Sequence, residues 1–412
     1  MKKLTLLIIV LIGIACQTNA QNPQWTVYNT GNSGLPYDHI NAIAIDENGT
    51  KWIGTSDGLA SFDGTNWTVY NTGNSGLPDD YINAITIDES GTKWIGTDDG
   101  GLATFDGTNW TVYNFDNSGL PDNSVRTIAI NENGTKWIGT FDDLASFDGT
   151  SWKVYNINNS GLTDATINAI AIDENGIKWI GTGVGSAGSL ASFNDTNWTV
   201  YNTDNSGLPN NWVRAITLDK NGTKWIGTYE GLASFDGTNW TVYNTGNSGL
   251  TDDYIDVITI DENGTKWIGT GYNLVSFDGT NWTIYNIDNS GLPGYEVKAI
   301  AIDKNGTKWI GTYEGLAAFN ENGIPNGVKE FNAIESKVNI YPNPVKNNLS
   351  IKTEDNTTIS SIKIINMQGT LIKSQTLANH QTIIKVGNLP TGVYVLKAYT
   401  EKGVAVSKFM KE

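Results

Sequence analysis

Two sets of side chains recur about every 42 residues along the chain, and together they have the chemistry to bind a sugar. The first set precedes a short apolar segment in each copy and comprises His39, Tyr81, Ser124, Thr166, Trp212, Tyr254 and Glu296. The second set follows two residues later and comprises Asn41, Asn83, Arg126, Asn168, Arg214, Asp256 and Lys298. Aromatic rings stack on the apolar C–H faces of sugars, while planar polar groups pair with the hydroxyls. These positions therefore favour a binding function, with a glycan as the expected ligand.

A third set of aromatic and acidic residues lies further along each copy. It comprises Asp57, Asp98, Asp99, Phe141, Asp142, Tyr229, Glu230, Tyr272, Tyr313 and Glu314, with a longer insert at Gly183–Ser189 in the fourth copy. From the three sets we predict ligand-binding roles for Trp212, Tyr81, Tyr254, His39, Glu296, Arg126, Arg214, Tyr229 and Tyr313. The alternative is that these side chains lie on a solvent-exposed surface of the repeats and differ between copies without any functional reason.

The sequence gives little sign of catalysis or of a cofactor. His39 is the only histidine of the repeats, and no nucleophile motif such as Gly-x-Ser-x-Gly accompanies it. One Cys and two His are too few for a zinc or haem site. The Asp46-Glu-Asn-Gly stretch and its copies lack the further oxygen donors of an EF-type loop and are expected to cap turns. We therefore predict no catalytic residue, no metal ligand and no cofactor. A calcium ion in a central channel enclosed by the repeats is kept as an alternative.

Tryptophan spacing identifies the elements that must position these residues. Lys-Trp-Ile-Gly-Thr places Trp at 52, 94, 137, 179, 225, 267 and 309, and Trp-Thr-Val-Tyr with its variants places Trp at 25, 67, 110, 152, 198, 240 and 282. Seven copies of about 42 residues fit a propeller with four strands per blade. These fourteen Trp account for all but Trp212 of the fifteen, and we expect them to pack between blades.

Each copy reads as four short antiparallel strands. In the first copy these are residues 40–46, 50–55, 59–63 and 67–71, with Asn-Gly and Asp-Gly turns after the first and third strands. An isolated Trp-Thr-Val-Tyr begins the series, whereas the last copy lacks one. The first strand should therefore complete the last blade and close the ring, which removes the exposed edges of an open array.

Antiparallel strands also sort the connections onto two faces. The turns after the first and third strands must share one face, and their sequences barely change among the seven copies. The other connections must share the opposite face, and their sequences vary. Because loops on a rigid scaffold usually carry function, the varying connections mark the expected binding face.

The N-terminus predicts export. Lys2 and Lys3 precede an apolar run of about a dozen residues and a small-residue stop at Ala20, as in a secretory signal peptide spanning residues 1–20. The alternative is a lipoprotein signal acylated at Cys16. The apolar run is short for a membrane span, which needs about 20 residues, and no other segment is long and apolar enough.

The repeat unit resembles the two-component regulator propeller repeat. The resemblance rests on Asn-Ser-Gly-Leu-Pro, then Asp-Glu-Asn-Gly-Thr-Lys-Trp-Ile-Gly-Thr, then Gly-Leu-Ala-Ser-Phe-Asp, and it spans about 300 residues. In that family such propellers often form the periplasmic sensor half of hybrid histidine kinases that sense oligosaccharides. The resemblance thus implies glycan recognition, but this chain carries no kinase or receiver region.

After a linker at residues 323–337, residues 338–412 read as a small β-sandwich that follows the propeller of residues 21–322. Short strands are expected at 338–344, 348–353, 362–366, 382–386, 389–397 and 405–411. The Tyr-Pro-Asn-Pro opening, Gly-Val-Tyr-Val-Leu-Lys and the terminal Lys-Phe-Met-Lys resemble the type A sorting domain of the type IX secretion system. This resemblance implies the type IX machinery as a partner and a location outside a Gram-negative, Bacteroidetes-like cell, released or attached to the outer-membrane surface.

Charge divides along the same boundary. Residues 338–412 hold nine lysines against four acidic residues, whereas residues 21–337 carry a net charge of −24, and the whole chain carries −17. An acidic propeller argues against nucleic acid as a partner, because phosphates need a basic face. The sequence thus predicts an all-β chain, a seven-bladed β-propeller and a β-sandwich, that binds a glycan or another surface protein. The alternatives are an extracellular lyase or glycosidase acting on polysaccharide, and a structural adhesion module.

Overall fold

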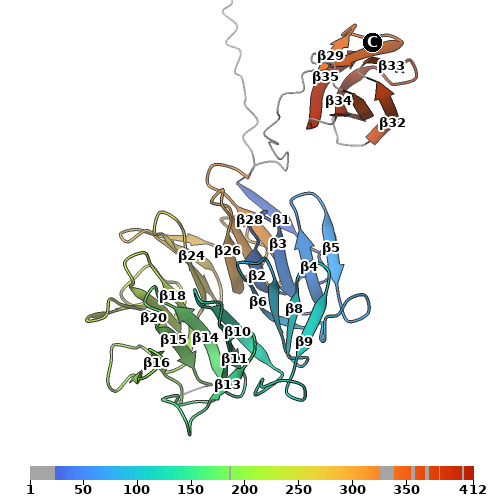
Figure 1. Cartoon of the computed structure of the whole chain (residues 1–412). Coiled ribbons are helices and arrows are strands. Elements are labelled where there is room, and N and C mark those ends of the chain that lie inside the picture. Colours follow the sequence, from blue (N-terminus) through green and yellow to red (C-terminus); the bar gives the residue numbers. More distant parts are fainter. Residues whose placement is uncertain are drawn as a thin grey trace, which may run out of the picture. The chain divides into compact units, whose positions relative to one another are not determined.

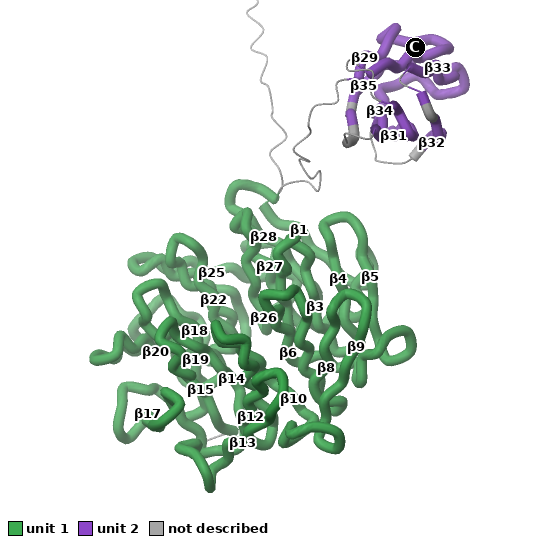
Figure 2. Tube along the Cα trace, viewed as in Figure 1, with its two compact units in different colours: residues 1–326 green, residues 327–412 purple. Residues whose placement is uncertain are grey.

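The computed structural model describes residues 24–184, 187–324, 338–353, 358–366, 371–379, 381–400 and 403–412. All the regular elements in these ranges are β-strands, as Figure 1 shows. The chain divides into two compact units at residues 326 and 327 (Figure 2). The expected signal peptide and most of the expected linker lie outside the described residues. Within the described part of the chain, no helix has the length and hydrophobicity that crossing a membrane requires.

The first unit consists of seven four-stranded antiparallel sheets, which are the seven predicted blades. Blade one comprises β2 (Ile40–Ile45), β3 (Lys51–Thr55), β4 (Gly58–Phe62) and β5 (Trp67–Tyr70), and blade two comprises β6 (Ile82–Ile87), β7 (Lys93–Thr97), β8 (Leu102–Phe105) and β9 (Trp110–Tyr113). Blade three comprises β10 (Val125–Ile130), β11 (Lys136–Thr140), β12 (Leu144–Phe147) and β13 (Trp152–Tyr155). Blade four comprises β14 (Ile167–Ile172), β15 (Lys178–Thr182), β16 (Leu190–Phe193) and β17 (Trp198–Tyr201).

The remaining blades follow the same plan, and the last one closes the ring. Blade five comprises β18 (Val213–Leu218), β19 (Lys224–Thr228), β20 (Gly231–Phe235) and β21 (Trp240–Tyr243), and blade six comprises β22 (Ile255–Ile260), β23 (Lys266–Thr270), β24 (Leu274–Phe277) and β25 (Trp282–Tyr285). Blade seven comprises β26 (Val297–Ile302), β27 (Lys308–Thr312), β28 (Gly315–Phe319) and β1 (Trp25–Tyr28), and β1 pairs with β28. The predicted closure by a shared blade is confirmed.

The hydrophobic core lies between neighbouring blades, because each sheet buries both faces. Trp52 of blade one packs with Ile82 and Phe105 of blade two in one buried cluster, and equivalent clusters join the other pairs. Gly54 allows this close approach, since a Cβ there would lie 2.5 Å from Cγ2 of Ile82. The Lys-Trp-Ile-Gly-Thr tryptophans are buried, while the Trp-Thr-Val-Tyr tryptophans are half-buried, so the expectation of inter-blade packing is confirmed.

Two kinds of polar contact fix the Lys-Trp-Ile-Gly-Thr segments, as blade one shows. Asp46 caps the turn after β2, where its Oδ1 accepts from the backbone N–H groups of Asn48 and Thr50, and its Oδ2 accepts from Nε1 of Trp52 at 3.3 Å. The lysine of each segment lies over the tryptophan of the preceding blade, as Lys93 does over Trp52 with Nζ 4.8 Å from the ring centroid. Cation–π contact between blades therefore repeats around the ring.

The second unit is a β-sandwich of two sheets around one apolar core. One sheet contains β29 (Val338–Tyr341), β30 (Asn348–Thr353) and β33 (Gln381–Lys385), and the other contains β31 (Ile359–Asn366), β32 (Leu371–Asn379), β34 (Gly392–Thr400) and β35 (Gly403–Lys411). Ile351, Ile364, Leu396 and Phe409 are among the side chains buried between the sheets. The sandwich prediction is confirmed, although the sequence reading did not propose β32, in which Lys373, Ser374, Gln375 and Thr376 interrupt the apolar pattern.

Candidate functional site

One face of the propeller holds all of its exposed large apolar side chains among the described residues. We call it the variable face and define it by the connections from the second to the third strand of each blade and from the fourth strand to the next blade, for example residues 56–57 and 71–81. The exposed side chains are Tyr37, Tyr81, Phe115, Phe141, Ile157, Val184, Tyr229, Tyr272, Tyr295 and Tyr313. The opposite hairpin face, which carries the Asn-Gly and Asp-Gly turns, has none among the same residues. Because a soluble surface rarely gathers apolar groups on one side without a partner, the variable face is the candidate binding face.

A β-bulge in each innermost strand determines which side chains reach the central channel at this face. In β2 the pairing with β3 shifts between Ile40 and Ala42, so that Asn41 is the extra residue. The same shift occurs in the other six innermost strands and leaves Asn83, Arg126, Asn168, Arg214, Asp256 and Lys298 as the extra residues. An extra residue leaves the strand ladder, so a bulge can re-aim its side chain. All seven line one cavity of about 470 Å³, together with Tyr81 and Asp98.

Three blades share a charged network in this cavity. Nε of Arg214 donates to Oδ1 of Asp256 at 3.0 Å, and a second guanidinium nitrogen contacts the same oxygen. Nζ of Lys298 lies 3.2 Å from Oδ2 of Asp256 and also pairs with Glu296. Burial alone would lower the pKa of Lys298, but Asp256 and Glu296 more than offset it and hold that pKa above its ordinary value. Each cation in this part of the cavity is therefore paired with a carboxylate.

The other side of the cavity is held by amides. Nη1 of Arg126 donates to Oδ1 of Asn168 at 2.9 Å, and its guanidinium carbon lies 5.1 Å from the centroid of the Phe141 ring. Nδ2 of Asn168 donates to the backbone oxygens of Gly183 and Val213. Nδ2 of Asn83 donates to Oδ1 of Asp98 at 3.1 Å. These bonds fix the polar side chains before any ligand binds.

Aromatic side chains form two groups at the rim of the cavity. Trp212 stacks on Tyr229 with ring centroids 5.1 Å apart, and Tyr229 meets Tyr254 edge-on at 5.2 Å. Arg214 connects this group to the channel, with its guanidinium carbon 4.6 Å from the Tyr254 centroid. The indole Nε1 of Trp212 is buried and has no hydrogen-bond partner among the described residues. The first group thus joins an aromatic wall to the charged network.

The second aromatic group is a histidine–tyrosine pair. The rings of His39 and Tyr313 meet edge-on with centroids 3.7 Å apart, and Nζ of Lys298 lies 5.2 Å from the Tyr313 centroid. Burial and the Lys298 charge lower the pKa of His39, against an opposing effect of Glu296. Burial raises the pKa of Tyr313, although Lys298 opposes it. A neutral imidazole beside a protonated phenol follows at neutral pH.

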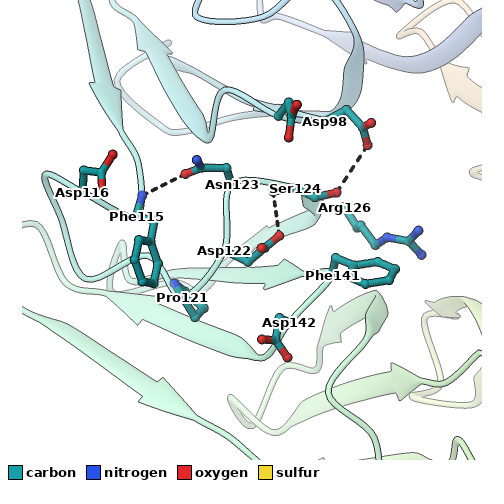
Figure 3. A pocket seen from close by; sticks show the side chains of 11 residues that line it. Asp98, Phe115, Asp116, Pro121, Asp122, Asn123, Ser124, Arg126, Phe141 and Asp142 are labelled. Carbon is teal, nitrogen blue, oxygen red and sulfur yellow. Dashed lines mark hydrogen bonds between the residues drawn. The ribbon is translucent and has the colours of Figure 1, made fainter.

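A larger and more acidic cavity of about 740 Å³ adjoins the channel between blades two and three (Figure 3). Its lining includes the carboxylates of Asp98, Asp99, Asp116, Asp122 and Asp142, the rings of Phe115 and Phe141, and Arg126, which also lines the channel cavity. Asp98 and Asp122 each accept a hydrogen bond from Ser124, through its hydroxyl and its backbone N–H respectively, as the dashed lines in Figure 3 show. Arg126 thus connects the two cavities.

The sequence-predicted binding residues all belong to the variable face or to the channel wall beneath it, and that they bind a ligand stays a prediction. Tyr81, Arg126 and Arg214 line the channel cavity, and Trp212, Tyr229 and Tyr254 form one rim group. His39, Tyr313 and Glu296 surround Lys298. Sequence reasoning missed the contact of Arg126 with Phe141 and the role of Phe115 and Asp122 in the second cavity. The exposed Phe115 was the available signal, because the other copies have Thr or Ile at its position.

The described residues contain no cluster of three or more His, Cys, Asp or Glu side chains placed to bind a metal ion. Asp256, the one carboxylate among the bulge residues, is already paired with Arg214 and Lys298. A calcium ion in the channel stays a prediction.

Two regions of the chain match known protein families. Residues 339–412 match the secretion system C-terminal sorting domain, and residues 207–230 match the two component regulator propeller. No curated protein matches the chain. The second match covers part of one repeat, but the same motif recurs in all seven blades.

Solved structures share the fold at low sequence identity. The extracellular domain of BT3049 from B. thetaiotaomicron, described as a putative hybrid two component system, is 21% identical with a TM-score of 0.64, and the alignment covers 94% of this chain and 57% of that one. PorZ of Porphyromonas gingivalis, described as an essential bacterial surface component of the type-IX secretion system, is 17% identical with a TM-score of 0.59, over 93% of this chain and 61% of that one. This chain thus spans about three fifths of the length of these relatives.

A third relative in structure is an enzyme. Virginiamycin B lyase from Staphylococcus aureus, solved as a catalytically inactive variant with quinupristin, is 14% identical with a TM-score of 0.57, over 71% of this chain and 98% of that one. At such identities these likenesses show the propeller fold alone. The family matches and the seven blades together show that the chain is built of two-component regulator propeller repeats and ends in a type IX secretion system sorting domain.

Proposed function

We propose that the propeller is a glycan-binding module that acts outside the cell, with its binding site at the channel mouth of the variable face. The observation that carries the proposal is the gathering of ten exposed large apolar side chains on that one face, around a channel mouth whose lining includes the seven polar bulge residues. Aromatic surface beside fixed polar groups is the combination that carbohydrate recognition requires. A cavity of about 470 Å³ suits a site for one or two sugar units.

Preorganisation supports a binding role. Asn168, Asn83 and Asp256 are already held by hydrogen bonds or ion pairs, so a ligand would not have to order them. Tyr229 is 47% exposed and stacks on Trp212, so it is accessible to a ligand while Trp212 supports its ring. A sugar could thus stack at the rim while its hydroxyls reach the amides below.

The sorting domain supports a location outside the cell. It indicates export by the type IX machinery, which we propose as the partner of residues 338–412, and delivery to the cell surface or the medium of a Gram-negative bacterium. The named relatives include an extracellular domain and a bacterial surface component, which agrees with that location. A soluble or surface-attached glycan would be accessible there.

The test is calorimetric titration of the full chain with a panel of neutral, acidic and amino oligosaccharides. We expect at least one member to bind, and we expect Trp212→Ala to weaken its affinity by about tenfold or more, because the aromatic wall is lost. Glu262→Ala, on the hairpin face, is the matched control and should bind normally. Equal melting temperatures for the variants would show that Trp212→Ala does not act through unfolding. No binding at millimolar concentration would reject the glycan proposal and favour a protein partner or a structural adhesion role.

A polysaccharide lyase is the second candidate, and the pair of His39 and Tyr313 is the observation that favours it. A neutral imidazole can accept a proton and a protonated phenol can donate one. Incubation with acidic polysaccharides separates the two candidates. Shorter products with an unsaturated terminal sugar, detected by ultraviolet absorbance and lost in His39→Gln, would show a lyase, whereas binding without any change in chain length would show a binding module.

A further inference from the structure

Both arginines of this chain line the channel cavity. The whole sequence contains two, Arg126 and Arg214, and both are bulge residues of innermost strands that line the channel cavity. The other permanently cationic side chains of the propeller are lysines. Arginine presents a planar fork of five N–H donors, which suits bidentate recognition of a planar or tetrahedral anion better than a lysine does.

The two arginines differ in the side chain that contacts each of them from the next blade. The neighbour of Arg214 in the next blade is Asp256, which pairs with it directly. The equivalent neighbour of Arg126 is Asn168, an amide, and Arg126 forms no ion pair with any residue that the structure describes. Asp98 lies in the same cavity, but its Oδ1 accepts from Asn83 and Ser124. Arg126 therefore keeps a positive charge without a paired carboxylate.

The guanidinium of Arg126 is also held in place. Asn168 uses its Nδ2 on two backbone oxygens, which fixes its Oδ1 toward Arg126, and the guanidinium carbon lies over the ring of Phe141. Figure 3 shows the guanidinium of Arg126 beside the ring of Phe141. Burial and the nearby Arg214 lower the pKa of Arg126 more than the charges of Asp98 and Asp122 raise it, so holding this charge has a cost that an anion would relieve.

We infer that the ligand at the channel mouth carries a carboxylate or sulfate group, and that Arg126 pairs with it. This inference rests on the glycan proposal and narrows it to acidic saccharides. The acidic group would accept hydrogen bonds from the guanidinium N–H groups that do not donate to Asn168, on the channel side of Arg126. The neutralised network of Arg214, Asp256 and Lys298 would then face the uncharged part of the sugar. The propeller as a whole is strongly acidic, so the anion would be selected by this local fork and not by long-range attraction.

The experiment uses the full chain and matched oligosaccharides in four arms: uronic acid oligomers from pectin and alginate, sulfated galactan oligomers, neutral cellulose and xylan oligomers, and chitosan oligomers as the cationic arm. We expect one acidic arm to bind most tightly, and comparison of the uronic and sulfated arms identifies the anion. Arg126→Gln keeps a polar group of similar shape beside Asn168, and it should weaken acidic binding by about 10- to 100-fold while neutral oligomers change little. Arg126→Lys should recover only part of the loss, because it restores the charge without the fork.

Lys220→Gln removes a cation from the hairpin face and should leave all arms unchanged, so it controls for net charge. Neutral oligomers that bind as tightly as acidic ones, with no effect of Arg126→Gln, would overturn the inference while the glycan proposal stands. Tighter binding of chitosan than of the acidic oligomers, with a further gain in affinity in Arg126→Gln, would overturn the inference and indicate that the aspartates bind the ligand. Failure of every arm would reject both proposals. A melting temperature within the error of the unsubstituted chain confirms that each variant is folded.

Discussion

Lys51 lies over the indole ring of Trp309, with its Nζ 4.6 Å from the ring centroid. This contact joins the first blade to the last and repeats, between lysine and tryptophan of successive blades, around the whole ring. Lys51 is 9% exposed, so its aliphatic stem packs in the interface as well. The ring is therefore closed twice, by the pairing of β1 with β28 and by the packing of Lys51 on Trp309.

The closing lysine should contribute to stability. We expect Lys51→Ala to lower the free energy of unfolding by about 1–3 kcal/mol, because it removes a desolvated cation–π contact and the packing of the stem. Urea unfolding followed by circular dichroism measures the change. Lys153→Ala, which removes an exposed lysine over Tyr155, should cost less than about 0.5 kcal/mol. Equal losses in the two variants would contradict a special role for the buried lysine.

Blade three lacks a hydrogen bond that the other six blades have. In those six an aspartate Oδ2 accepts from the indole N–H, but blade three has Asn131, and Nε1 of Trp137 is buried without a partner among the described residues. Because Oδ1 of Asn131 accepts from Thr135, the amide NH₂ group occupies the place of the missing acceptor. Asn131→Asp should therefore stabilise the chain by about 1 kcal/mol, measured as a rise in melting temperature.

The controls for this prediction lie in the same turns. Asn133→Asp adds the same charge to the turn of Asn131 but at a position that caps Thr135, so it should not stabilise. Asp219→Asn should copy the defect into blade five and cost a similar amount, because Trp225 would lose its acceptor. A destabilised Asn131→Asp variant would show that the added charge outweighs the hydrogen bond.

His39 should titrate below its ordinary pKa of 6.5, because burial and Lys298 disfavour the imidazolium more than Glu296 favours it. Nuclear magnetic resonance of the imidazole protons measures this pKa, with His39→Gln to assign the signal against His380. Lys298→Met should raise the His39 pKa, and Glu296→Gln should lower it further. The lowered pKa contributes stability that is present above pH 6.5 and is lost as the pH falls through the folded-state pKa, since the unfolded chain then binds the proton first. A His39 pKa above 6.5 would contradict the described surroundings.

The sequence was enough to predict the blades and the two faces of the propeller, but not which side chains of the channel pair with one another. The repeated motifs that contain Trp52 and Trp67 locate the strands of each blade. The Asn-Gly and Asp-Gly turns then predict the strand order, because such turns join neighbouring antiparallel strands. The seven channel residues were also found, since they repeat at one position. Their bulges were not, because a register shift depends on the pairing of β2 with β3 and leaves no local signature. The different surroundings of Arg126 and Arg214 depend on the neighbouring blade and became visible only in the closed ring.

The central claim is that ligand binds at the variable face, and hydrogen exchange measures it most directly. The full chain should be compared with and without a saturating amount of the tightest member of the oligosaccharide panel. We predict slower amide exchange at the channel mouth, in residues 37–41, 79–83, 122–126 and 210–214, and no change in the Asn-Gly turns such as 46–50. Protection confined to those turns, or no protected segment with any oligosaccharide, would contradict the account.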